Sequence, residues 1–317
     1  MVTEAAPRHD VLSNVQPAAT QGRADQRAWI ILALLTVYII WGTTYLGIRL
    51  ALESFPPFLM MGIRFVTAGG GLLFFLRLRG TPMPTRKQWR SAAIVGGLLM
   101  VGGMGLTATA EETVSSGLTA TLVAAAPLWT LIFSLIWKHR PTRIEWLGVA
   151  VGLIGVGLLS LEGNLRANPA GIVLMLFASA CWALGSVWST HLEIAPGAMG
   201  NASEMLCGGV MLVTLGLLGG QRITAMPTTS ALLALVYLTT FGSLATMSAY
   251  MFLLKTVSHS LATSYAFVNP AIALLLGMAI GGEHLTGGAL IALPVILMGV
   301  AFVAFGRQHT ALSSDKR

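Results

Sequence analysis

The sequence predicts an all-α polytopic membrane protein with ten transmembrane helices in two inverted five-helix repeats. Three observations predict it: the apolar composition, the sidedness of the basic residues and an internal repeat. Of the 317 residues, 55% are hydrophobic and only 10% are charged, whereas soluble domains carry about 25% charged residues. Because backbone groups in lipid need hydrogen-bond partners within their own segment, the long apolar runs are predicted to be helices.

Ten apolar stretches follow one another along the chain, each long enough to cross about 30 Å of hydrocarbon. Turn-forming pairs such as Pro56-Pro57 and Gly281-Gly282 separate them. Residues 1–28 are polar and predict a flexible cytoplasmic tail. The first apolar run is too long for a signal-peptide core, so it is interpreted as a helix. The predicted spans are 29–50, 58–78, 91–109, 116–136, 144–161, 170–190, 199–218, 231–254, 260–280 and 287–306.

The basic residues lie mostly on one side of this array. With a cytoplasmic amino terminus, fifteen of the 19 Lys and Arg residues fall on inner segments, three fall at outer ends, and Arg64 lies within a span. An excess of basic residues on the cytoplasmic side is typical of membrane proteins, so an even number of helices with both termini inside is predicted. Because the charge is gathered in inter-helix loops, the net charge of +7 does not indicate a nucleic-acid partner.

A repeat with a spacing of about 141 to 144 residues relates the two halves of the chain. Residues 112–121 are echoed by residues 255–264, and a proline follows each copy at the same distance, Pro127 and Pro270. Five helices is an odd number, so the second copy must enter the membrane with opposite polarity. Such inverted repeats are typical of secondary transporters that bind substrate near the midplane. The predicted domains are a tail 1–28, a first repeat 29–161, a second repeat 162–306 and a tail 307–317.

Aromatic and polar side chains near the middle of the spans are candidates for a substrate cavity. Trp41 and Trp182 are equivalent in the two repeats and lie away from the interfaces where tryptophan concentrates. An indole there either packs between helices or forms the floor of a cavity, and Ser or Thr hydroxyls either bond to their own helix or face a ligand. The candidate cavity residues are Trp41, Thr43, Thr44, Tyr45, Arg64, Trp182, Ser186, Tyr250, Tyr265 and Asn269.

Ionisable residues within or near the spans allow both functional and structural interpretations. A charge such as Arg64 costs at least about 2.5 kcal/mol in a span unless it meets water or a partner. It is either a substrate-carboxylate anchor or part of an outer gate, or else it pairs with Glu53 or reaches toward the headgroups. Glu204, near the repeat counterpart of Arg64, is a candidate gate or titrating residue, with structural pairing as the alternative. Glu111 and Glu112 are interpreted as a solvated helix end.

Pro127 and Pro270 are candidate hinges. Each proline removes an intrahelical hydrogen bond and can kink a span. Their recurrence in both repeats predicts a hinge or a locally opened backbone, as transporters use at binding sites. A static kink is the alternative.

Signatures of enzymes and of metal or cofactor sites are not found in the sequence. It contains no HExxH, GxSxG or P-loop motif, its six histidines are scattered, and Cys181 and Cys207 lie inside apolar stretches without CxxC spacing. No cofactor and no metal are therefore predicted. Two alternatives to a transporter stay open: an intramembrane enzyme acting on lipids, and a non-transporting membrane scaffold.

Several stretches resemble EamA-type members of the drug/metabolite transporter superfamily. They are Tyr-Ile-Ile-Trp-Gly-Thr-Thr-Tyr at 38–45, Arg64, Ser-Gly-Leu-Thr-Ala at 116–120 with Pro127, and the run 262–270 followed by Gly282-Glu283. The resemblance covers about residues 29–306. It implies two inverted five-helix repeats around a central cavity in the bacterial inner membrane, with a small-molecule substrate and the lipid bilayer as partners. It further implies export of metabolites such as amino acids, aromatic or neutral ones included; the oligomeric state stays open.

Overall fold

The computed structural model describes the backbone of residues 16–114, 119, 122–123, 125–138, 141–160, 169–269 and 271–272, and eight further residues between 291 and 302. Throughout this part of the chain every regular element is a helix, and six helices are long and apolar enough to cross a membrane. The all-helical membrane class is therefore confirmed. Parts of the predicted spans 116–136 and 260–280, and most of 287–306, lie outside the described residues.

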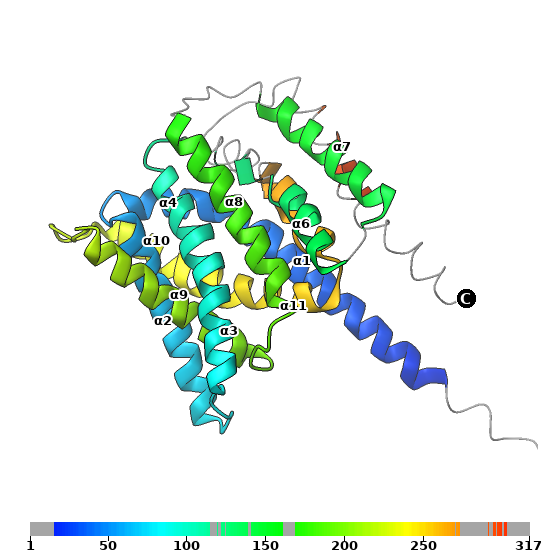
Figure 1. Ribbon diagram of the computed structural model, residues 1–317, viewed down its shortest axis with the longest axis horizontal. Coiled ribbons are helices and arrows are strands. Elements are labelled where there is room, and N and C mark those ends of the chain that lie inside the picture. The colour runs from blue at the N-terminus through cyan, green and yellow to red at the C-terminus, as the bar shows by residue number, and fades with distance from the viewer. Residues whose placement is uncertain are drawn as a thin grey trace, which may run out of the picture.

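The first half contains three long helical segments followed by shorter ones (Figure 1). Helix α2 starts with Pro57 in its first turn, where the missing N–H is not needed. Helix α3 starts at a capping box in which Thr85 and Gln88 each accept a hydrogen bond from the other's backbone N–H. The elements are α1 Gln16–Leu52, α2 Pro57–Leu78, α3 Arg86–Gly96, η1 Gly97–Gly105, α4 Leu106–Ala110, α6 Ala126–Ser134, η2 Leu135–Trp137 and α7 Arg143–Ser160.

The second half repeats this succession of helices. Helix α10 begins behind Thr228, whose side chain accepts a hydrogen bond from the Ala231 N–H, and α12 begins behind Ser258 in the same manner. The elements are α8 Pro169–Ser189, α9 Ala198–Leu218, α10 Thr229–Tyr237, η3 Leu238–Ala245, α11 Thr246–Thr256 and α12 His259–Ala262. Residues 265–269 are again helical.

Helix α1 begins earlier than the sequence predicts. Its first residue is Gln16, so residues 16–28 of the predicted tail are helical. Alanine, glutamine and arginine are frequent in this segment, and all three favour helix. Pro17 lies in the first turn, where proline is tolerated. In Figure 1 the amino-terminal part of α1 extends well beyond the helical bundle.

Large apolar side chains cover the outer surface of the long helices. Phe74 of α2, Val173 of α8 and Leu233 of α10 are each about two-thirds exposed. Apolar patches of this extent on a soluble monomer mark an interaction surface, and a lipid phase solvates them without cost. The surface therefore agrees with a protein embedded in a bilayer.

Two of the long helices contain a π-helical stretch. The stretch η1 begins at Gly97 between α3 and α4, and η3 begins at Leu238 between α10 and α11. Their first residues are 141 positions apart, which matches the repeat spacing in the sequence. Because π-helical turns shift the hydrogen-bond register, they often occur at functional sites.

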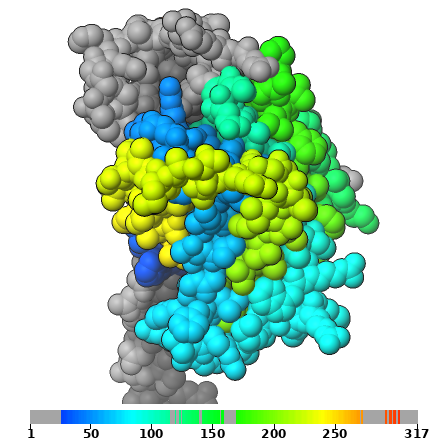
Figure 2. All heavy atoms as spheres, turned by 90° about the vertical axis from the view of Figure 1, so that its left-hand side faces the viewer, coloured from blue at the N-terminus to red at the C-terminus, as the bar shows by residue number. Residues whose placement is uncertain are grey.

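Helices α2 and α9, one from each half, pack against each other through glycines. A Cβ on Gly62 would meet the Val213 side chain and backbone, and a Cβ on Gly69 would lie 2.5 Å from the Leu206 nitrogen. Residue numbers rise along α2 while those of its partners fall along α9, so the two helices are antiparallel. Figure 2 likewise shows yellow-green segments of the second half lying beside blue and cyan segments of the first.

Pro127 lies in the first turn of α6 rather than in the middle of a longer helix. Ala125, two residues before Pro127, is in a turn, and α6 starts at Ala126. The helix is therefore interrupted ahead of the proline, so this residue does not kink a continuous helix. Pro270, the second predicted hinge, lies outside the described residues.

Candidate functional site

A cavity of about 520 Å³, a volume that includes the space at its open side, lies between helices of both halves. Helix α1, the segment from η1 to α4, and α6 contribute from the first half, while α8 and residues 265–269 contribute from the second. Six of the ten predicted residues line it: Trp41, Thr44, Tyr45, Trp182, Tyr265 and Asn269. Their positions along the sequence are far apart, so only the fold brings them together.

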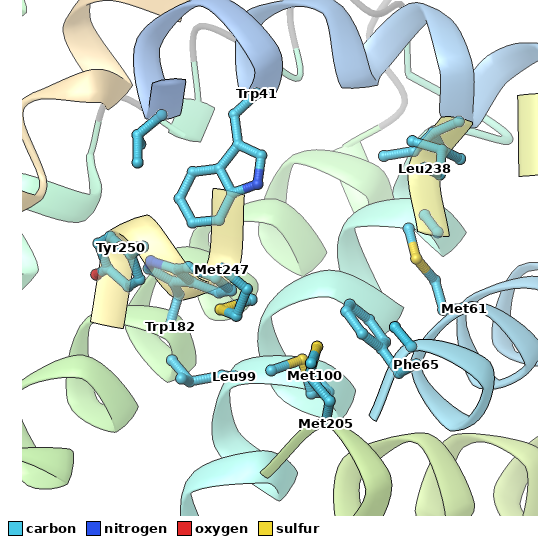
Figure 3. Packing of buried hydrophobic residues seen from close by; sticks show 14 of the residues in the cluster. Trp41, Met61, Phe65, Leu99, Met100, Trp182, Met205, Leu238, Met247 and Tyr250 are labelled. Carbon is cyan, nitrogen blue, oxygen red and sulfur yellow. The ribbon is translucent and has the colours of Figure 1, made fainter. Parts of the chain in front are cut away.

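Four aromatic rings form one cluster at this cavity. Trp41 lies 5.3 Å from Trp182, 5.1 Å from Tyr250 and 4.7 Å from Tyr265, measured between ring centroids. The Trp41–Trp182 and Trp41–Tyr265 pairs are edge-to-face, a favoured geometry worth about 0.5–1.5 kcal/mol beyond area burial. Figure 3 shows Trp41 pointing from α1 toward Trp182 and Tyr250. The cluster therefore joins α1, α8 and α11.

The two repeat-related tryptophans differ in their hydrogen bonds. Trp41 Nε1 donates to the Gly242 carbonyl oxygen at 3.2 Å, within the π-helical stretch η3. Trp182 Nε1 is buried and has no hydrogen-bond partner among the described residues. A buried N–H without an acceptor is costly. Trp182 therefore offers the cavity a free donor, whereas Trp41 is fixed by the scaffold.

Asn269 is the other cavity residue with free polar atoms. It is fully buried, and neither its Oδ1 nor its Nδ2 has a partner within the described part of the chain. Thr44, by contrast, donates to the Trp41 carbonyl oxygen at 2.7 Å. Among the described lining residues, the fully buried polar atoms that make no hydrogen bond thus belong to Trp182 and Asn269, and the Tyr45 hydroxyl lies beside Asn269.

Three of the predicted residues support the cavity without lining it. The Tyr250 hydroxyl lies 2.6 Å from Ser186 Oγ, and Ser186 in turn donates to the Trp182 carbonyl oxygen at 2.7 Å. This pair fixes α11 to α8 behind the aromatic cluster. Thr43 donates to the Ile40 carbonyl oxygen at 2.7 Å and bonds to the Tyr237 hydroxyl. Its hydroxyl is therefore engaged between helices.

Arg64 is fully buried and is not among the residues that line the cavity. Its Nε donates to Ser243 Oγ at 2.7 Å, while its Nη2 has no partner among the described residues. The guanidinium also lies 4.9 Å from the Phe65 ring centroid. These contacts attach α2 to η3 and place the charge behind the wall formed by Trp41 and Gly242.

Glu204 is also fully buried, on the face of α9 that packs against α3. Its carbonyl oxygen would touch a Cβ on Gly96, and neither carboxylate oxygen has a partner among the described residues. It is absent from the cavity lining. Glu204 thus lies at the contact of α9 with α3 rather than among the described lining residues.

The expectation that Glu111 and Glu112 form a solvated helix end is wrong for Glu111. Glu112 is exposed, but both carboxylate oxygens of Glu111 are buried and lack a partner in the described part. The Glu111 N–H donates to the Thr107 carbonyl oxygen at 3.0 Å, so Glu111 lies one turn beyond a residue that lines the cavity. The 3.6-residue period could have revealed this shared face, because Met104, Thr107 and Glu111 follow helical spacing.

These features define a polytopic helical membrane protein in which two similar halves enclose a central cavity. The chain belongs to the EamA-like transporter family, whose sequence model matches residues 28–161 and again residues 169–305. The resemblance noted in the sequence is thereby confirmed. The two matches begin 141 residues apart, as the repeat in the sequence does.

Two relatives illustrate what the chain is similar to. The inner membrane transporter YedA of Escherichia coli (strain K12) is 45% identical over 276 residues, which are 87% of this chain and 90% of that protein. A protein of Salmonella typhimurium named "Probable amino-acid metabolite efflux pump" is 24% identical and covers 87% of this chain and 94% of its own. One solved crystal structure is similar in fold, with a TM-score of 0.72 at 20% identity, covering 89% of this chain and 98% of that one.

Proposed function

We propose that the protein is a secondary transporter or facilitator that exports small metabolites, amino acids among them, by alternating access through the central cavity. The cavity itself carries this proposal, because it is bounded by both halves and presents free polar atoms beside aromatic rings. Ligand sites are typically apolar cavities with a few polar groups that fix orientation. No cofactor enters the proposed mechanism.

The proposal includes ten helices in two inverted repeats. The family match to both halves supports a duplication, and the antiparallel contact of α2 with α9 supports inversion, because these helices occupy equivalent places in the two copies. If the repeats were instead related by an axis along the membrane normal, equivalent helices would run parallel to each other. Inverted repeats that rock about a central site are the usual basis of alternating access. Pro127 and Pro270 remain the proposed hinges.

The chemistry of the cavity supports amino acids, neutral or aromatic, as a substrate class. Trp41, Trp182 and Tyr265 offer flat apolar area to a side chain. The free N–H of Trp182 and the amide of Asn269 can donate to a substrate carboxylate. Arg64 lies behind the wall, so in this proposal it holds η3 in place rather than binding the carboxylate. The relative named as an amino-acid metabolite efflux pump agrees with this class.

The two alternatives from other classes are less well supported. A scaffold has no need for a cavity at the junction of both halves, or for free polar atoms within it. A lipid-modifying enzyme needs acid, base or metal-binding side chains at one depth, and no group of three or more His, Cys, Asp or Glu residues with metal-binding geometry lies in the described part of the chain. The transporter proposal accounts for both the cavity between the halves and the free polar atoms within it.

The first prediction concerns orientation: both termini are expected to face the cytoplasm. The fifteen-to-three distribution of Lys and Arg is its physical reason. Reporter fusions after Arg317, one active only in the cytoplasm and one only in the periplasm, measure it. Activity of the periplasmic reporter alone would reverse the proposed topology.

The second prediction concerns transport. Purified protein in liposomes is expected to accumulate or release at least one member of a panel of labelled amino acids, faster than liposomes without protein. Running the panel with and without a pH gradient separates proton coupling from facilitated diffusion. If no amino acid or related metabolite crosses faster than in empty liposomes, the proposed function is wrong.

A further inference from the structure

Glu111 lies one helical turn beyond the residues that line the cavity. Glu111 follows the last turn of α4, and its N–H bonds to the carbonyl oxygen of Thr107, a lining residue. Side chains four residues apart on a helix lie on the same face, so the Glu111 side chain continues the lining by one turn. On α1, Tyr45 lines the cavity and lies within electrostatic range of Glu111.

This carboxylate has no partner that accounts for its burial. Both oxygens are inaccessible to solvent and accept no hydrogen bond from the described residues. A buried ionised carboxylate is strongly disfavoured unless a cation or donors accompany it. The adjacent Glu112 is exposed, so burial is specific to one of the two neighbours.

Among the described residues, Arg49 is the charged group that acts on Glu111, and it is not hydrogen-bonded to the carboxylate. From α1, Arg49 and Tyr45 face it, and the Arg49 side chain is exposed. The helices α2 and α8 also pack against α4. Their Arg64 and Cys181 lie elsewhere, Arg64 bonded to Ser243 and Cys181 beside Gly102.

The rest of the cavity also favours a cation over an anion. Four aromatic residues line it, Trp41, Tyr45, Trp182 and Tyr265, and aromatic faces attract cations. Among the described lining residues there is no lysine or arginine. An ammonium group near Glu111 would therefore gain a carboxylate partner together with aromatic surroundings.

We propose that Glu111, together with Tyr45, forms an ammonium-binding end of the cavity, and that the substrate class combines a protonated amine with an apolar or aromatic body. This inference rests on the proposed function, since it assigns a role to the same cavity. Amino acids satisfy it, and so do simple amines; anions without an amine do not. The carboxylate of an amino acid would meet Trp182 and Asn269, and Asn269 lies beside the Tyr45 hydroxyl.

A pH dependence follows from the same geometry. Burial raises the pKa of Glu111 well above its ordinary value, an effect that the Arg49 charge opposes. Below this pKa the carboxyl group is neutral and binds an ammonium weakly; as the pH rises through the pKa, the carboxylate forms and affinity increases. The rise ends where the amine itself loses its proton, near pH 10 for a simple alkyl ammonium. A proton and the substrate cation thus compete for Glu111.

The test is calorimetric binding to the purified full-length protein of four probes that share a phenyl body: 2-phenylethylamine, phenylalanine, 3-phenylpropionate and 2-phenylethanol. The wild type is expected to bind the two ammonium compounds and to bind 2-phenylethylamine more tightly than its neutral counterpart. Glu111→Gln is expected to weaken binding of the ammonium compounds by about 30-fold or more, as loss of one partner of a buried charge pair does. Glu112→Gln, the matched control, is expected to leave affinity unchanged.

Several outcomes would overturn the inference: equal binding of 2-phenylethylamine and 2-phenylethanol by the wild type, no binding of either ammonium compound, or equal losses in the two glutamine variants. If Glu111→Gln fails to fold, the wild type alone still tests the inference, because its affinity for 2-phenylethylamine is expected to rise with pH. An affinity that does not rise with pH would contradict the inference. Binding that depends on Glu111 without movement of the probe into liposomes would contradict the proposed function alone. Transport that is unaffected by Glu111→Gln would contradict this inference alone.

Discussion

Gly69→Ala is expected to lower the stability of the protein by about 2 kcal/mol or more, as overpacking of a tight interface does. A Cβ at this position would lie 2.5 Å from the Leu206 nitrogen and 2.8 Å from the Ala202 carbonyl oxygen. Both are backbone atoms of α9, so no flexible side chain can move aside. The two helices would have to separate along the contact that joins the halves.

Gly71→Ala, two residues further along α2, is the matched control. Nothing lies within 4 Å of a Cβ there, so the substitution is expected to be neutral or to stabilise by up to about 1 kcal/mol through helix propensity. Thermal unfolding of the two variants and the wild type in the same detergent measures the difference. Equal stability of the two variants would contradict the close approach of α2 and α9.

Phenylalanine substitutions at the two repeat-related tryptophans are expected to have different consequences: one lowers substrate affinity and the other lowers stability. Trp182→Phe keeps an aromatic ring and removes a buried N–H that has no hydrogen-bond partner among the described residues, so stability should change little. Affinity for phenylalanine should fall about tenfold, the value of one hydrogen bond to a charged group. Trp41→Phe should instead lower stability by about 1–3 kcal/mol, because the Gly242 carbonyl oxygen loses its donor.

Calorimetry and thermal unfolding on both variants test this pair. The comparison is internally controlled, since each variant removes the same atoms from an equivalent position of the repeat. Equal losses of stability would mean that the Trp182 N–H has a structural partner after all. An unchanged affinity in Trp182→Phe would remove it from the proposed substrate contacts.

Packing, rather than composition, decided which candidate residues belong to the cavity. Depth in the first span made Trp41, Thr43, Thr44 and Tyr45 candidates, and the structure has all of them except Thr43 at the cavity. Arg64 was an equally good candidate by depth, but its side chain points toward Ser243 of η3. Depth in a span follows from sequence position; the direction of a side chain depends on the neighbouring helix.

Glu111 shows the limit of local reasoning most clearly. Two consecutive carboxylates at a helix end usually indicate solvent, and Glu112 agrees with this. Glu111 differs because it lies one turn beyond Thr107, within electrostatic range of Tyr45 on α1. Helical spacing places Glu111 on the face of Thr107, but only the tertiary structure shows that this face is turned away from solvent.

The sequence by itself determined the membrane class and the duplication, because apolar length, side-chain charge and a repeat spacing of about 141 residues are properties of the chain read in one dimension. Its family followed from the resemblance of short motifs, which are equally local. The tertiary structure decided what depends on contacts between distant segments. These are the antiparallel glycine contact of α2 with α9, the clustering of rings from α1, α8 and α11 with Tyr265, and the burial of Glu111. The physical reason is that lipid selects for apolar helices in general, whereas close packing between particular helices decides which polar atoms stay free for a ligand.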